Sequence, residues 1–129
     1  MRARLLKSIS PIVKTSKKKL PSLLIVDDDE EIRTQMRWTL ASDYRILQAE
    51  DRPSAMKVFR AESPAVVLLD LGLPPHAGTP EEGLATLAEI QSIAPRTKVV
   101  VISGQSEKSI ALQTIGEGAY DFLGKPVDT

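Results

Sequence analysis

The sequence has no cysteine, few aromatic residues and no long apolar run. Without cysteine the chain forms neither disulfides nor thiolate metal sites, which is typical of proteins in a reducing compartment. No apolar run approaches the roughly 18 residues of a membrane span, and the first residues lack the apolar core and cleavage site of a secretory signal peptide. We therefore expect a cytoplasmic protein with no membrane partner.

The 129 residues suffice for one domain with a hydrophobic core. The net charge of zero hides an asymmetry, because residues 1–20 carry seven basic and no acidic side chains while residues 21–129 carry ten basic and seventeen acidic ones. We expect a solvated basic arm over residues 1–21, followed by a domain over residues 22–129. The acidic balance of that domain argues against nucleic-acid binding by the domain itself.

Short apolar runs alternate with segments whose apolar residues have helical spacing. The runs cover residues 23–26, 44–47, 65–69, 98–102 and 119–123. Consecutive apolar positions at 66–69 and 99–102 are typical of parallel strands that are covered on both faces. This pattern predicts an α/β fold with a doubly wound, five-stranded parallel sheet. Asp28 with Glu31, and Thr79 with Pro80 and Glu82, predict helix starts near residues 29 and 80.

Polar residues follow the ends of the predicted strands, where ligands gather in open parallel sheets. The first strand runs into residues 27–29, all aspartate, the third ends at Asp70, the fourth at Ser103, and Lys125 follows the fifth. Crowded carboxylates repel one another unless a cation neutralises them. Mg²⁺ suits one or two carboxylates with water and phosphate oxygens, so the set is competent for phosphoryl transfer to an aspartate.

Four stretches resemble the signature blocks of the receiver domains of two-component response regulators, in the order of that family. They are residues 24–33 (LIVDDDEEIR), 66–74 (VVLLDLGLP), 99–104 (VVVISG) and 118–126 (GAYDFLGKP). The resemblance covers residues 23–127, and it implies the flavodoxin-like strand order 2-1-3-4-5, for which the family is a known example. The ending at residues 118–126 resembles receivers that head nitrogen-regulation-type transcriptional activators.

The resemblance also implies a role for each matching residue. Asp70 is expected to be the phosphoacceptor, Asp28 a direct Mg²⁺ ligand, and Asp27 a residue that acts on the metal through water. The Gly72 carbonyl is expected to bind the metal, and Ser103 and Lys125 are expected to bind the phosphoryl group. Phe122 matches the family's switch aromatic, and Pro126 matches the proline that follows the lysine. Phe122 can equally be an ordinary core residue.

Blander interpretations exist for each residue alone. The three aspartates at 27–29 fit a solvated helix start, Asp70 a turn, Ser103 a helix cap and Lys125 a surface lysine. Two other functions are also compatible with parts of the sequence. A phosphatase of the haloacid dehalogenase type would use Asp27 and Asp29 as its Asp-x-Asp pair, and a pseudo-receiver would be an unphosphorylated docking module.

The sequence departs from the family pattern before the third helix. Gly78 lies at the usual distance from the phosphoacceptor, yet the family-like stretch begins at Gly83, so about five residues are additional. The residues 79–82 suggest that these additions form a helical turn. His76 in this loop is expected to be a surface residue, and Trp38 to pack on or near the first helix.

We therefore expect a signalling domain and not an enzyme, phosphorylated on Asp70 by a sensor histidine kinase with Mg²⁺. Phosphorylation should draw Ser103 inward and alter the surface around the fourth helix, the fifth strand and Phe122, with homodimerisation as one outcome. A transcriptional output domain beyond this chain is the expected partner, and a stand-alone receiver is the alternative.

Only residues 127–129 follow the Lys-Pro pair, so we expect the family's fifth helix to be missing and the domain to be C-terminally truncated. We expect one face of the sheet to be partly bare, with a loose N-terminal arm. The alternative is cover by a partner chain or by the arm, whose Leu5, Leu6 and Ile9 have helical spacing although Pro11 interrupts the pattern.

Overall fold

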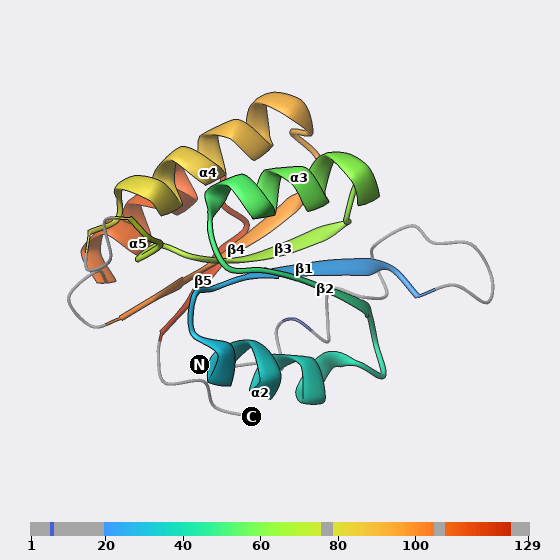
Figure 1. Cartoon of the computed structure of the whole chain (residues 1–129). Helices are drawn as coiled ribbons and strands as arrows, with labels where there is room; N and C mark the ends of the chain where they lie inside the picture. The colour runs from blue at the N-terminus through green and yellow to red at the C-terminus, as the bar shows by residue number, and fades with distance from the viewer. Residues whose placement is uncertain (1–5, 7–19, 76–78, 105–107, 125–129) are drawn as a thin grey trace.

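The predicted alternation of strands and helices is present in the computed structural model, which describes residue 6 and residues 20–75, 79–104 and 108–124 (Figure 1). The element order is β1 (Ser22–Val26), α2 (Glu30–Leu40), β2 (Arg45–Ala49), α3 (Arg52–Glu62), β3 (Val66–Asp70), α4 (Glu81–Ile93), β4 (Lys98–Ser103), α5 (Lys108–Gly116) and β5 (Asp121–Gly124). The five strands form one parallel sheet in the order β2-β1-β3-β4-β5, which confirms the expected fold.

The helices lie on both faces of the sheet. Helices α3, α4 and α5 cover one face, while α2 lies on the other (Figure 1). The central pairing aligns Val26 with Leu69 and Asp70 with Ile102. The carboxyl ends of β1, β3 and β4 therefore meet at one edge, which is where the site must be sought.

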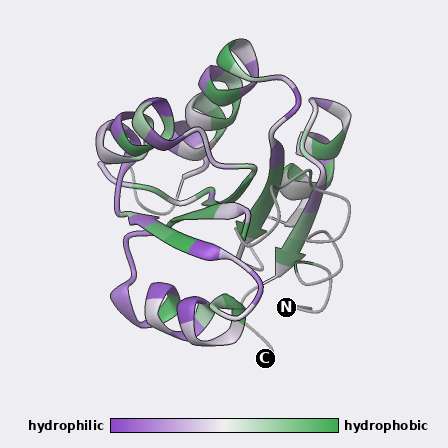
Figure 2. Cartoon of the chain, turned by 90° about the vertical axis from the view of Figure 1, so that its right-hand side faces the viewer, coloured by the Kyte–Doolittle hydropathy of each residue, from purple (hydrophilic) through white to green (hydrophobic). Residues whose placement is uncertain are grey.

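Burial on both faces explains why the central strands are apolar at consecutive positions. All five residues of β3 are buried, and the strands are largely green against purple outer helix surfaces in Figure 2. The core has two parts, one under α3 and α4 and one on the α2 face. Trp38 does not pack as expected, because its side chain on α2 is 78% exposed.

The helix starts differ in detail from the prediction. Asp29, not Asp28, is the N-cap of α2, and its Oδ1 accepts from the backbone N–H groups of Glu31 and Ile32 at 2.9 and 3.4 Å. Helix α4 begins at Glu81 with Pro80 in the N-cap position and no side-chain cap, so the predicted Thr79 cap is wrong. Proline has no side-chain acceptor, and acidic residues in the first turn suit the positive end of the helix instead.

Leu6 of the basic arm is part of the core on the α2 face. Its side chain is completely buried in a cluster with Leu23, Leu68 and Val100 of the strands and Met36 and Leu40 of α2. The hydroxyl of Tyr44 donates a hydrogen bond to the Leu6 carbonyl oxygen. The expectation of a loose arm is therefore wrong at Leu6. At this residue the arm covers the sheet face beside α2, as the alternative predicted. The rest of residues 1–19 lies outside the described residues.

Within the described residues, no helix follows β5. None of the helices described is both long and apolar enough to cross a membrane.

Candidate functional site

Three carboxylates meet at the carboxyl edge of the sheet. Asp27 follows β1 directly, Asp28 is the next residue, and Asp70 ends β3, the strand beside β1. One oxygen from each lies within 4.8 Å of the other two. Asp27 and Asp70 are 0% and 2% exposed, whereas Asp28 faces solvent. The adjacency of β1 and β3 thus brings together residues that are far apart in the sequence.

The loop after β1 is fixed by hydrogen bonds around Asp27. The backbone N–H of Asp29 donates to Asp27 Oδ1 at 2.9 Å, and Asp27 N–H donates to the Ala49 carbonyl at 3.1 Å. From α2, the Arg33 guanidinium donates to the Asp27 carbonyl oxygen at 2.7 Å and to Gln48 Oε1 at 3.3 Å. The sequence alone indicated no role for Arg33, although Arg33 is the last residue of the first signature block.

Asp29 takes no part in the carboxylate cluster. Its side chain caps α2, and among the described residues the group of three that could hold a metal consists of Asp27, Asp28 and Asp70. This arrangement disfavours the Asp-x-Asp interpretation, because that mechanism needs Asp27 and Asp29 in one site and leaves Asp70 without a role.

The segment after Asp70 is held between two buried leucines. Leu71 and Leu73 are fully buried in the core under α3 and α4, and Leu71 N–H donates to the Ile102 carbonyl at 3.2 Å. Gly72 lies between them, and its N–H donates to Asp70 Oδ1 at 3.2 Å. The Gly72 position is therefore tied both to the core and to the Asp70 carboxylate. The peptide bond between Pro74 and Pro75 that follows is cis.

Ser103 ends β4 beside Asp70 and is 1% exposed. Phe122 lies in β5 and is half-buried against the core under α3 and α4. Lys125, Pro126 and His76 lie outside the described residues, so their predicted places are untested. Asp27, Asp28 and Asp70 lie together at the carboxyl edge, and their chemical roles and that of Gly72 remain predictions.

The donor set fits a hard divalent cation. Three carboxylates within 4.8 Å repel one another strongly, and this repulsion favours a bound cation. Oxygen ligands from one or two carboxylates, completed by water and phosphate oxygens, are typical of Mg²⁺. The acidic cluster is therefore consistent with a metal site.

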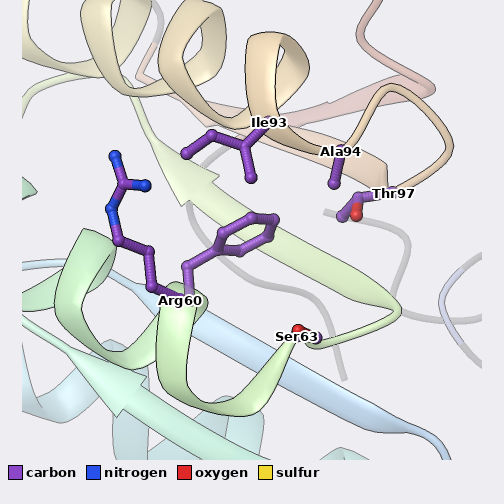
Figure 3. A pocket seen from close by; sticks show the side chains of 6 residues that line it. Arg60, Ser63, Ile93, Ala94 and Thr97 are labelled. Atoms are coloured by element: carbon purple, nitrogen blue, oxygen red, sulfur yellow. The ribbon is translucent and has the colours of Figure 1, made fainter.

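A hollow at the opposite end of the sheet has a different character. It has a volume of about 400 Å³ and lies between the C-terminal ends of α3 and α4, where Phe59, Ser63, Ile93 and Ala94 line it with Arg60 and Thr97 (Figure 3). Arg60 is engaged with Glu89 at 3.1 Å. The lining residues include no acidic side chain, so the carboxylate edge is the better candidate for chemistry.

Comparison with known proteins agrees with the geometry. Residues 23–129 match the response regulator receiver domain family. The chemotaxis protein CheY of Listeria monocytogenes is 33% identical over 106 residues, which are 81% of this chain and 85% of CheY. The nitrogen assimilation regulatory protein NtrX of Azorhizobium caulinodans is 34% identical over 105 residues, which are 81% of this chain and 22% of NtrX.

A solved structure supports the same relationship. The crystal structure of the NtrX receiver domain from Brucella abortus has a TM-score of 0.75 at 35% identity, covering 83% of this chain and 88% of that one. The chain also spans 22% of the C4-dicarboxylate transport transcriptional regulatory protein DctD of Rhizobium meliloti, with 28% identity. The fold, the aspartate cluster and these matches lead to one conclusion: the chain belongs to the response regulator receiver domain family, whose members are phosphoacceptor modules of signalling.

Proposed function

We propose that Asp70 accepts a phosphoryl group from the phosphohistidine of a sensor histidine kinase, in the cytoplasm and with Mg²⁺ bound. The observation that carries this proposal is the meeting of the Asp27, Asp28 and Asp70 carboxylates within 4.8 Å at the carboxyl edge of the sheet. Of the three, Asp70 ends the central strand β3, and the resemblance of residues 66–74 to the receiver family assigns it as the acceptor.

In the transfer, an Asp70 carboxylate oxygen forms a bond to phosphorus while the phosphorus–nitrogen bond to the donor imidazole breaks, and the imidazole leaves as the neutral base because its other ring nitrogen already carries a proton. A bound Mg²⁺ would supply charge neutralisation for the phosphoryl oxygens. Asp28 and Asp70 would hold it directly with the Gly72 carbonyl, and Asp27 would act through water. Lys125 would pair with a phosphoryl oxygen.

The switch would begin at Ser103. This hydroxyl ends the strand next to Asp70 and is almost fully buried, so it can approach a phosphoryl oxygen with little backbone movement. Its movement would bias the surface formed by α5 and β5, where Leu112, Ile115 and Tyr120 are 53%, 39% and 42% exposed. Phe122 would follow from β5, and homodimerisation is one readout of the change.

The output is proposed to be transcriptional. DctD and the NtrX proteins are transcriptional or nitrogen-assimilation regulators by name, and this chain spans only part of their length. A stand-alone receiver is the alternative, to which the match over 85% of a CheY protein gives support.

The test uses acetyl phosphate and beryllofluoride as phosphoryl donor and phosphoryl mimic. Wild type should gain one phosphoryl group by intact-mass spectrometry and bind beryllofluoride only with Mg²⁺, whereas Asp70→Asn should do neither. Asp29→Asn serves as the matched control, because Asp29 caps α2 and lies outside the cluster.

Three results distinguish the functions. Phosphorylation of Asp70→Asn at the wild-type rate and stoichiometry would disprove the assignment. Beryllofluoride bound at Asp27 would favour the phosphatase, and no binding by folded wild type would favour the pseudo-receiver.

A further inference from the structure

Gly83 lies where helix α4 touches the backbone that follows the proposed phosphoacceptor. A Cβ atom at this position would lie 2.4 Å from Leu71 Cα, 2.6 Å from its carbonyl oxygen and 2.8 Å from its carbonyl carbon. These atoms are backbone, so no side-chain rotation could make room for a methyl group. The first turn of α4 therefore rests directly on the peptide that leads from Leu71 to Gly72.

The contacted peptide is fixed on its other sides as well. Leu71 N–H is bonded to the Ile102 carbonyl, and the Leu71 side chain is fully buried in the core under α3 and α4. Gly72 N–H is bonded to Asp70 Oδ1. Gly83 closes the side on which α4 lies, so the place of the Leu71 backbone, one residue before Gly72, depends on how closely α4 approaches.

Ion pairs hold α4 against α3 and oppose any retreat of the helix. Arg52 of α3 pairs with Glu82 at 3.5 Å and with Glu89 at 3.2 Å, and Arg60 pairs with Glu89 at 3.1 Å. Glu82 is adjacent to Gly83. A methyl group at residue 83 would therefore be accommodated partly by a shift of the Leu71 backbone and not only by movement of α4.

We infer that Gly83 is a positioning residue for the metal site, which acts by setting the place of the Gly72 carbonyl through the Leu71 backbone. The inference rests on the proposed function, in which that carbonyl is a Mg²⁺ ligand. Ordinary van der Waals contact begins near 3.4 Å, so a Cβ at 2.4 Å requires a displacement of about 1 Å. This displacement is shared between α4 and the Leu71 backbone. Mg²⁺ demands near-ideal octahedral geometry, so the part that reaches the Gly72 carbonyl disturbs its place in the metal shell.

The test compares the Mg²⁺ dissociation constants of wild type and Gly83→Ala by calorimetry, with the melting temperature measured alongside. We expect the dissociation constant to rise about 10- to 100-fold, the range typical of lost ligand orientation. Beryllofluoride binding at a fixed, subsaturating Mg²⁺ concentration should fall in parallel and recover when Mg²⁺ is raised.

Two control variants separate positioning from general destabilisation. Gly116→Ala makes the same chemical change at the end of α5, where an added Cβ meets nothing within 4 Å. Ile90→Ala removes a fully buried side chain two turns further along α4, and it should lower the melting temperature. Both should keep the wild-type Mg²⁺ affinity.

The outcomes are distinct for the inference and for the proposed function. A folded Gly83→Ala with wild-type Mg²⁺ affinity overturns the inference alone, as does an equal loss of affinity in Ile90→Ala. Absence of Mg²⁺ and beryllofluoride binding in wild type and both controls overturns the proposed function. If Gly83→Ala does not fold, the measurement is repeated in trimethylamine N-oxide, which favours compact states. Failure to fold there also counts against the inference, because the contact would then serve the whole fold.

Discussion

Truncating Leu6 to alanine should destabilise the folded domain by about 2 to 5 kcal/mol, the range for fully buried leucines in well-packed cores. Leu6 is completely buried, and its neighbours come from the strands as well as from α2. Those strands are held in register by the sheet, so they cannot collapse into the space that the side chain leaves. The loss is large against a total stability of about 5 to 15 kcal/mol for a domain.

The measurement is urea unfolding followed by far-ultraviolet circular dichroism, because Trp38 is 78% exposed and reports poorly on the core. The matched control is Leu20→Ala, a leucine that is 50% exposed just before β1, which should change the free energy of unfolding by less than about 0.5 kcal/mol. Equal m-values would show that the native and unfolded states are unchanged in compactness. If Leu6→Ala is as stable as Leu20→Ala, Leu6 is not a core residue and the face beside α2 is covered by something else.

Three further changes test the site and its surroundings. Arg33→Met should weaken Mg²⁺ binding several-fold in calorimetry, because it removes the charge-assisted hydrogen bond to the Asp27 carbonyl. Arg37→Met, at an exposed position of the same helix, should leave Mg²⁺ binding unchanged. Equal Mg²⁺ affinities of the two variants would refute the role of Arg33. Burial, with the nearby Asp43 carboxylate second, raises the pKa of Tyr44 from 10.0 to about 12. The stabilisation from the neutral Tyr44 phenol is complete below pH 10 and is lost as the pH rises through about 12. In unfolding experiments Tyr44→Phe should therefore show a smaller fall in the free energy of unfolding over this pH range than wild type, while Tyr120→Phe should show the wild-type fall. Ser103→Ala should still be phosphorylated but should lose phosphorylation-driven dimerisation in analytical ultracentrifugation; the same dimerisation as wild type would exclude Ser103 from the switch.

The strands were predictable because burial on both faces leaves a direct mark on the sequence. Residues 66–69 and 99–102 are apolar without interruption, and all are buried in β3 and β4. The place of the site followed from topology, since the carboxyl ends of neighbouring parallel strands share an edge. The sequence alone therefore predicts that Asp27 and Asp70 lie close together.

The helix caps were less predictable, because several residues competed for one role. The run Asp27-Asp28-Asp29 offers three side chains that could cap α2, and only the orientation of each carboxylate separates the Asp29 cap from the Asp27 and Asp28 cluster. Leu6 was uncertain for another reason. Its burial depends on strands distant in the sequence, and Pro11 weakened the helical pattern around it.

The additional residues before α4 show why the site can remain intact when its surroundings change. The sequence left open which glycine begins the family-like helix, because Gly78 has the usual spacing and Gly83 the usual neighbours. In the structure Gly83 makes the close contact with Leu71, so α4 is positioned by that contact and not by a fixed number of residues after Asp70. Residues inserted between Leu73 and Glu81 then lengthen the connection without displacing either end, since Leu73 is buried in the core and Glu82 is paired with Arg52. The positions of Asp70 and Gly72 are therefore set by contacts that lie outside this connection.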